Sequence, residues 1–159
     1  MNFLSQSEKE TGAFGKKLAA KLKGGEVILL YGELGAGKTA LVKGLAAGLG
    51  IKKTITSPTF ALMNVSSIKT LKHKNIKTKG QKEKFVHIDT YRLKDAQELI
   101  DIGVEDYLGA PDTICAIEWP EKIEGLLKKI RQRRTGLGPD KIVAVTIKHL
   151  ANGGRKIIF

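Results

Sequence analysis

The sequence predicts an α/β fold in three layers, a mostly parallel sheet with antiparallel strands added at the C-terminal end. Short apolar runs alternate along the chain with segments of helical apolar spacing, which is typical of a parallel sheet covered by helices. A glycine-rich loop separates the apolar run Val27–Tyr31 from the helical pattern of 38–49. The turn signal at 152–154, between two alternating segments, predicts a closing antiparallel hairpin.

The first half of the chain is expected to begin with a helix. Residues 7–10 have the pattern of a capping box, and Phe14, Leu18 and Leu22 then recur every four residues on one face. Two glycines at 24–25 end this helix before the strand at 27–31. Beyond the helix at 38–49, a further strand is expected at 60–65.

The second half continues the alternation of strands and helices. Strands are expected at 85–89, 114–119, 142–150 and 155–159, and helices at 95–102 and 121–130, with a turn at 136–139. We find no internal repeat and no domain boundary. The chain is therefore expected to be a single domain, 1–159, with a basic insertion at about 67–84.

Residues 32–39 fit the phosphate-binding pattern G-x-x-x-x-G-K-[ST], and this segment lies between a strand and a helix as the P-loop requires. Its glycines allow backbone N–H groups to face phosphates, and the helix N-terminus adds a partial positive charge. Lys38 can then reach the β- and γ-phosphates, and the Thr39 hydroxyl can bind Mg²⁺. The sequence therefore predicts a P-loop nucleotide-binding protein, and the predicted fold is a P-loop NTPase-like sheet.

Two acids, Asp89 and Glu118, each end an apolar run that is predicted to be a strand. The ligand crevice of an open α/β sheet lies at the carboxyl ends of its strands, so both carboxylates can converge on a metal ion beside Thr39. One can bind Mg²⁺ while the other positions or deprotonates the attacking water. The sequence does not assign these roles, and an ordinary surface carboxylate is the alternative for each acid.

Four further residues have both a functional and an ordinary interpretation. Thr59, within 56–59, follows the P-loop helix and is a candidate γ-phosphate sensor or part of a plain turn. Arg92 is a candidate for charge stabilisation or a surface salt bridge. Trp119 is expected to pack in the core or an interface, with contact to a partner or stacking on a nucleic acid as the alternative. His87 is expected to pack between apolar neighbours rather than to act in catalysis.

The net charge is +12, and half of it comes from 67–84, where seven lysines accompany one glutamate. A second basic cluster comprises Lys128, Lys129, Arg131, Arg133 and Arg134. Such patches suit an RNA-facing surface, but 67–84 contains no aromatic residue on which bases could stack, and a solvated loop is the alternative.

Composition excludes some classes of protein. There is no apolar run of membrane-spanning length and no signal-peptide pattern, so we expect a cytoplasmic protein without a membrane association. The single cysteine, Cys115, lies within an apolar run and is expected to be a buried structural thiol rather than a nucleophile.

The chain resembles the TsaE (YjeE) family, P-loop ATPases of bacterial tRNA threonylcarbamoyladenosine biosynthesis. The resemblance rests on five blocks in order, together with Glu10-Thr11 and Gly154-Arg155 near the two ends. The blocks are GELGAGKT at 32–39, SPTF at 57–60, HIDTYRL at 87–93, ELIDIGVEDYL at 98–108 and IEWPE at 117–121. They span nearly the whole chain. The basic stretch at 67–84 is longer and more basic than is usual in the family.

The resemblance implies that the protein binds ATP and Mg²⁺ and hydrolyses ATP weakly unless partner proteins activate it. The implied partners are the TsaD and TsaB proteins, which transfer the threonylcarbamoyl group to the adenosine beside the anticodon of ANN-decoding tRNAs; tRNA is contacted, if at all, through that complex. The implied catalytic residues are Lys38, Asp89 and Glu118, and Thr39 joins the two acids as a metal ligand. Trp119 belongs with Glu118 to a second essential site. The implied nucleotide-binding set is Gly32, Glu33, Leu34, Gly35, Ala36, Gly37, Lys38, Thr39, Ala40, Thr11 and Thr59.

Two other classes of P-loop protein compete with this interpretation. A small-molecule kinase needs an arginine-bearing lid and an acceptor pocket, and the basic run 128–134 is the only candidate lid. A GTP-driven switch would carry the guanine-reading pattern Asn-Lys-x-Asp, which is absent.

Overall fold

The computed structural model describes residues 2–58, 60–68, 84–133 and 137–159. Its strands form a sheet in the order β1-β7-β6-β2-β5-β4-β3. The strands are β1 Asn2–Ser5, β2 Val27–Tyr31, β3 Met63–Ser67, β4 Lys84–Asp89, β5 Thr113–Glu118, β6 Ile142–His149 and β7 Arg155–Ile158. The α-helices are α1 Glu8–Ala19, α2 Lys38–Gly48, α3 Gln97–Asp101 and α4 Glu124–Arg133, and short 3₁₀ turns lie at Val104–Asp106, Pro120–Ile123 and Pro139–Lys141.

The centre of the sheet is parallel and its margins are antiparallel. β6, β2, β5 and β4 are parallel neighbours, whereas β7 pairs antiparallel with β6, as the predicted closing hairpin requires. The fold class predicted from the sequence is therefore confirmed. Two antiparallel pairings extend it: β1 pairs with β7, and β3 pairs with β4 at the other edge. No strand was predicted at β1, and β3 begins three residues later than the strand expected at 60–65.

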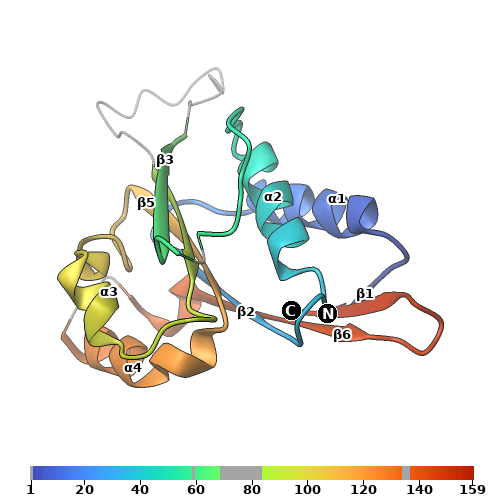
Figure 1. Cartoon of the computed structure of the whole chain (residues 1–159). Coiled ribbons are helices and arrows are strands. Elements are labelled where there is room, and N and C mark those ends of the chain that lie inside the picture. Colours follow the sequence, from blue (N-terminus) through green and yellow to red (C-terminus); the bar gives the residue numbers. More distant parts are fainter. Residues whose placement is uncertain (1, 59, 69–83, 134–136) are drawn as a thin grey trace, which may run out of the picture.

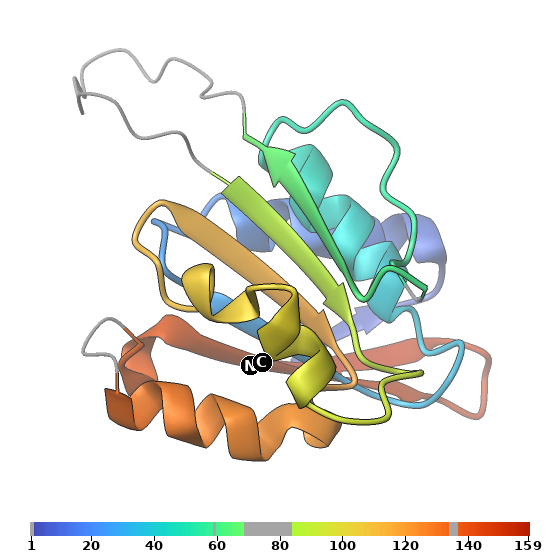
Figure 2. The same ribbon diagram turned by 60° about the vertical axis from the view of Figure 1, so that its left-hand side comes forward.

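Helices cover both faces of the sheet and make three layers (Figures 1 and 2). On one face, α1 and α2 pack over the residues of β2 and β5 that include Ile28, Leu30 and Ala116. On the other face, α3 and α4 pack over the alternate residues, including Val27, Leu29 and Cys115. Because the side chains of a strand alternate between faces, each central strand contributes to both cores.

Local sequence signals set the ends of the helices. At the start of α1, the Ser7 hydroxyl accepts a hydrogen bond from the Glu10 backbone N–H at 3.2 Å, which confirms the predicted cap. The Glu10 carboxylate reaches back to the backbone N–H of Gln6 at 2.8 Å, one residue before the position of the usual capping box. The helix predicted at 121–130 begins as a 3₁₀ turn at Pro120 and becomes α-helical at Glu124.

The helices α1 and α2 approach each other closely because glycines line their contact. A Cβ atom built on Gly44 of α2 would lie 2.1 Å from the carbonyl oxygen of Gly12 in α1, and one on Gly15 would lie 2.4 Å from the carbonyl oxygen of Leu41. Only glycine leaves room for backbone against backbone at such distances. The helix that begins at the P-loop is thereby held directly against the N-terminal helix.

Cys115 lies in the middle of β5 with no exposed surface, and burial raises the pKa of its thiol well above the ordinary value. Since the thiolate is the reactive species, we expect Cys115 not to react with a thiol reagent in the native protein at neutral pH, and to react quickly in denaturant. Spectrophotometric titration with an aromatic disulfide reagent measures this difference. Rapid labelling of the native protein would contradict the structural role assigned to this residue.

Most of the basic insertion, 69–83, lies outside the described residues, as does Arg134 of the second basic cluster. The other four members of that cluster, Lys128, Lys129, Arg131 and Arg133, are exposed on α4. Among the residues that the structure describes, no helix is long and apolar enough to cross a membrane.

Candidate nucleotide-binding site

The glycine loop connects β2 to α2, and three of its glycines have positive φ. Gly35 at φ 77° and Gly37 at φ 104° have backbone conformations that a side chain would strain. Gly37 directly precedes the first residue of α2, so backbone N–H groups and the helix N-terminus face the same space. This arrangement is what the P-loop pattern predicts, and it forms an anion-binding cradle.

Lys38 is almost completely buried, and its ammonium group is held inside the loop. Its Nζ donates to the carbonyl oxygens of Gly32 at 2.7 Å and Glu33 at 2.8 Å, and lies 3.7 Å from the centre of the Trp119 ring. Burial lowers the pKa of Lys38, while the neighbouring carboxylates of Glu118, Glu121 and Asp89 act in the opposite direction.

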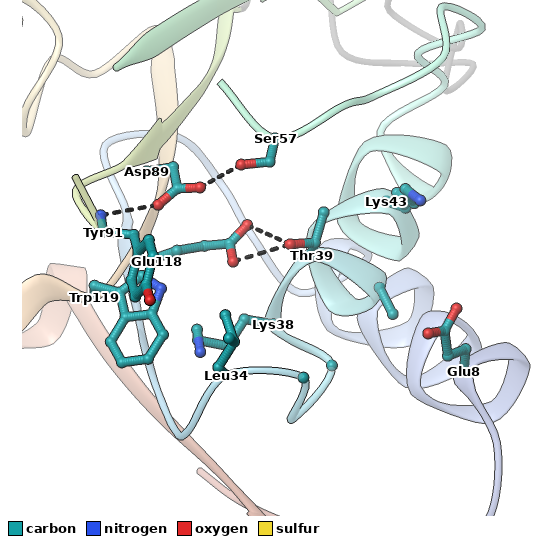
Figure 3. A pocket seen from close by; sticks show the side chains of 13 residues that line it. Glu8, Leu34, Lys38, Thr39, Lys43, Ser57, Asp89, Tyr91, Glu118 and Trp119 are labelled. Carbon is teal, nitrogen blue, oxygen red and sulfur yellow. Dashed lines mark hydrogen bonds between the residues drawn. The ribbon is translucent and has the colours of Figure 1, made fainter. Parts of the chain in front are cut away.

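Asp89 and Glu118 end neighbouring parallel strands and lie opposite each other in register. Both carboxylates are nearly buried, at 5% and 3% exposure, on the face of the sheet that α2 covers. The Thr39 hydroxyl at the start of α2 donates to Glu118, 3.0 Å from each carboxylate oxygen (Figure 3). The structure thus brings together Thr39 and the two acids that the sequence singled out.

Asp89 fixes the loop that follows α2. Its Oδ2 accepts a hydrogen bond from the Ser57 hydroxyl, and its Oδ1 accepts one from the backbone N–H of Tyr91 at 3.0 Å (Figure 3). Thr59, the predicted γ-phosphate sensor, lies outside the described residues. Within this block, Ser57 is the hydroxyl that the structure places in the pocket lining.

Trp119 has a backbone conformation that is unusual for a large side chain. Its φ of 60° and ψ of 47° lie in the left-handed region, immediately before Pro120. Such strain typically costs about 1–3 kcal/mol and persists where the surroundings enforce it. Here the Thr90 hydroxyl donates to the carbonyl oxygens of Trp119 at 2.6 Å and of Glu118 at 3.0 Å. The ring is thereby held over Lys38 and 5.0 Å from the ring of Tyr91.

These groups surround a pocket of about 320 Å³ (Figure 3). Nine of the residues singled out in the sequence line it: Leu34, Gly35, Gly37, Lys38, Thr39, Ala40, Asp89, Glu118 and Trp119. Gly32, Glu33 and Ala36 belong to the loop without lining the pocket. Glu8, Lys43, Ser57 and Tyr91 complete the lining.

Thr11 lies behind the loop, with no exposed surface. Its hydroxyl is 2.9 Å from that of Ser5 and donates to the carbonyl oxygen of Ser7 at 3.2 Å. Its methyl group would lie 3.7 Å from a Cβ atom built on Gly37. In this structure Thr11 therefore supports the loop from below. Its predicted contact with a nucleotide stays a prediction.

Two other predicted candidates lie away from the pocket. The Arg92 guanidinium lies 4.5 Å from the centre of the exposed Phe60 ring. α4, which carries the basic run considered as a kinase lid, packs on the opposite face of the sheet through Leu126, Leu127 and Ile130. The described part of that run is therefore not in the position of a lid over the glycine loop.

Sequence reasoning missed the participation of Ser57 and His87. His87 is buried, as expected, but its Nε2 lies 2.9 Å from Oε1 of Glu118. The sequence held an indication of this contact, because His87 and Asp89 are two residues apart and their side chains therefore lie on the same face of a strand. The contact of Ser57 with Asp89 depends on how the loop returns to the sheet, which no local pattern indicates.

The donors in the pocket suit a hard cation such as Mg²⁺, which prefers carboxylate and hydroxyl oxygens. Thr39, Glu118 and Asp89 supply such atoms. Over the described ranges, no group of three or more His, Cys, Asp and Glu side chains could hold a metal ion unaided.

Comparison with known proteins agrees with these features. The family model described as "Threonylcarbamoyl adenosine biosynthesis protein TsaE" matches residues 5–157. The chain is 34% identical to the tRNA threonylcarbamoyladenosine biosynthesis protein TsaE of Treponema pallidum over 157 residues, which cover 99% of this chain and 98% of the relative. It is 33% identical over 150 residues to the Bacillus subtilis protein of the same name, covering 94% of this chain and 78% of the relative.

A solved structure gives the same result for the fold. The crystal structure of Bacillus subtilis YdiB superimposes with a TM-score of 0.69 at 26% sequence identity, covering 99% of this chain and 82% of that protein.

Proposed function

This chain belongs to the TsaE family, and we propose on that basis that it is the ATP-binding and ATP-hydrolysing subunit of tRNA threonylcarbamoyladenosine synthesis. The observation that carries the proposal is the contact of the P-loop Thr39 hydroxyl with Glu118, beside Asp89 on the neighbouring strand. A P-loop alone binds phosphate. A P-loop with two carboxylates at its metal end has the groups that hydrolysis requires.

In this proposal the nucleotide phosphates lie in the glycine loop, against the backbone N–H groups at the start of α2. Lys38 turns from the carbonyl oxygens of Gly32 and Glu33 toward the phosphates, because their charge attracts its ammonium group more strongly than neutral carbonyls do. This movement also separates the ammonium group from the Trp119 ring. In this proposal nucleotide binding therefore changes the surroundings of Trp119, the one tryptophan in the sequence.

Thr39 and Glu118 would hold Mg²⁺, whose chemistry in such sites is to neutralise phosphate charge. Asp89 already holds Ser57 and the backbone N–H of Tyr91, so it is placed to couple the 57–60 loop to the phosphate end of the pocket. We assign Glu118 to the metal end and Asp89 to the organisation of this loop and of the attacking water. The direct contact of Glu118 with Thr39 supports the division.

The proposed partners are the TsaD and TsaB proteins, which perform the transfer to ANN-decoding tRNAs. ATP hydrolysis by this chain supports repeated cycles of that complex and is slow in its absence. The exposed basic residues of α4 are available for contacts with the complex or with its tRNA. The basic stretch at 67–84 is proposed to contact the same complex or its tRNA.

The test is ATP hydrolysis by the purified chain with Mg²⁺, first alone and then with TsaD–TsaB and tRNA. We expect slow turnover alone, stimulation of roughly tenfold or more by the complex, and loss of activity in Lys38→Ala, which removes the charge that faces the phosphates. Lys52→Ala, at an exposed lysine beyond α2, is the matched control and should hydrolyse ATP normally. Phosphate release that the complex does not change, or phosphate passed to a small acceptor, would contradict the proposal and favour a kinase.

A further inference from the structure

A buried histidine contacts the acid at the metal end of the site. His87 lies on β4 and Glu118 on the neighbouring strand β5, with side-chain exposures of 1% and 4%. The His87 Nε2 is 2.9 Å from Oε1 of Glu118. Glu118 lines the pocket, whereas His87 lies one layer behind it and is absent from the described lining.

The surroundings of the ring assign its proton. The other ring nitrogen, Nδ1, is buried and has no hydrogen-bond partner among the described residues. An ionised carboxylate only accepts hydrogen bonds, so the contact with Glu118 requires a hydrogen on Nε2. The ring therefore carries a hydrogen on Nε2 and donates it to Glu118.

The Glu118 carboxylate thus accepts hydrogen bonds from two sides, from His87 on β4 and from Thr39 on α2. A glutamate side chain has several rotatable bonds, so without these partners its carboxylate could turn away from Thr39. Hydrogen bonds to a charged acceptor in a buried site are strong and directional. His87 approaches from a rigid central strand, so it restricts the direction in which the carboxylate points.

We propose that His87 is a positioning residue that holds Glu118 toward Thr39 and so prepares the metal end of the site before nucleotide binds. The role is that of a group behind a metal ligand, which orients the ligand without touching the ion. This inference rests on the proposed ATPase function. It adds a residue for which composition and strand pattern predicted only packing.

Three substitutions at this position separate orientation from packing. In His87→Gln, the amide nitrogen can occupy nearly the position of Nε2 and still donate to Glu118. In His87→Asn the amide occupies the position of Nδ1 and falls short, and His87→Leu has no donor. We expect kcat to fall roughly 10- to 100-fold in the Asn and Leu variants, with little change in KM for ATP, and the Gln variant to stay within about threefold of wild type.

A structural control on the same strand is Ile88→Ala, whose side chain points to the opposite face. If this variant has the same loss of thermal stability as His87→Leu and an equal loss of kcat, the effect of His87 is general destabilisation and the proposal is wrong. Equal activities of the Gln and Asn variants would also overturn it. In a Glu118→Gln background, His87→Leu should lower kcat by less than about twofold further, because the charged carboxylate that His87 orients has already been removed.

A measurement without nucleotide keeps this inference separate from the proposed function. Nitrogen-15 NMR of the histidine rings in the full-length protein reports which ring nitrogen carries the hydrogen. We expect a hydrogen on Nε2 of His87, with the signal of that nitrogen displaced in Glu118→Gln. An Nε2 that carries no hydrogen would overturn the inference even if the protein hydrolyses ATP. Absence of ATP hydrolysis in the wild type would contradict the proposed function and leave the NMR result to decide the role of His87.

Discussion

Glu118→Gln is expected to lower the rate of ATP hydrolysis at least about 100-fold while ATP binding changes by no more than a few-fold. The substitution keeps the size of the side chain but removes the charge that faces Thr39. The groups proposed to bind the phosphates, Lys38 and the backbone of 32–39, are unchanged. Removing a negative charge beside the phosphates also relieves repulsion, so tight binding without turnover is the expected phenotype.

The measurements are the steady-state rate with Mg²⁺ in the presence of TsaD–TsaB and tRNA, and calorimetric titration with a non-hydrolysable ATP analogue. Glu124→Gln is the matched control, since it removes an equal charge from an exposed side chain of α4, which packs on the opposite face of the sheet. The control should retain nearly full activity. A Glu118→Gln variant with wild-type turnover, or one that no longer binds the analogue, would refute the role given to this carboxylate.

Gly44→Ala is expected to lower the free energy of unfolding by about 2–3 kcal/mol, although alanine favours a helix by about 1 kcal/mol over glycine. The added Cβ would lie 2.1 Å from the Gly12 carbonyl oxygen and 2.8 Å from two other Gly12 backbone atoms. Backbone cannot yield as a flexible side chain does, so α1 and α2 must move apart. Since α2 begins at Lys38, the same movement should weaken ATP binding.

Gly125→Ala is the matched control for this prediction. It lies on α4, where an added Cβ meets nothing within 4 Å and φ is not positive, so alanine should leave stability unchanged or raise it by up to about 1 kcal/mol. Chemical denaturation followed by circular dichroism measures both variants. Equal stability of the two would show that the α1–α2 contact is able to relax and that the glycines are not required there.

Most of the architecture could be predicted because it follows from local patterns. The strands β2, β4 and β5 and the helix α2 lie within a residue of their predicted bounds. Their bounds are set by apolar periodicity and flanking glycines, which are signals carried by a few neighbouring residues. β1 escaped prediction, because a four-residue edge strand carries little periodicity. Its pairing with β7 joins the two ends of the chain, and no local signal reports that contact.

In the candidate site, too, some features could be predicted from the sequence and others could not. The P-loop and the two strand-end acids were predicted, because a phosphate-binding loop needs a fixed order of residue types and the carboxyl ends of parallel strands meet at one edge. The approach of both acids to Thr39 was expected, but the particular hydrogen bonds that Glu118 makes with Thr39 and His87 were not predicted. Thr39 and Glu118 are 79 residues apart in sequence, and His87 and Glu118 are 31 apart.

The sequence by itself thus determined which chemical groups the protein possesses and which short elements carry them. Only the tertiary structure decided that Lys38 lies against Trp119, that His87 donates to Glu118 and that Ser57 bonds to Asp89. The physical reason is that periodicity and loop chemistry act over a few residues, whereas these contacts are set by strand register and by the close approach of helices. Register and approach depend on the packing of the whole core.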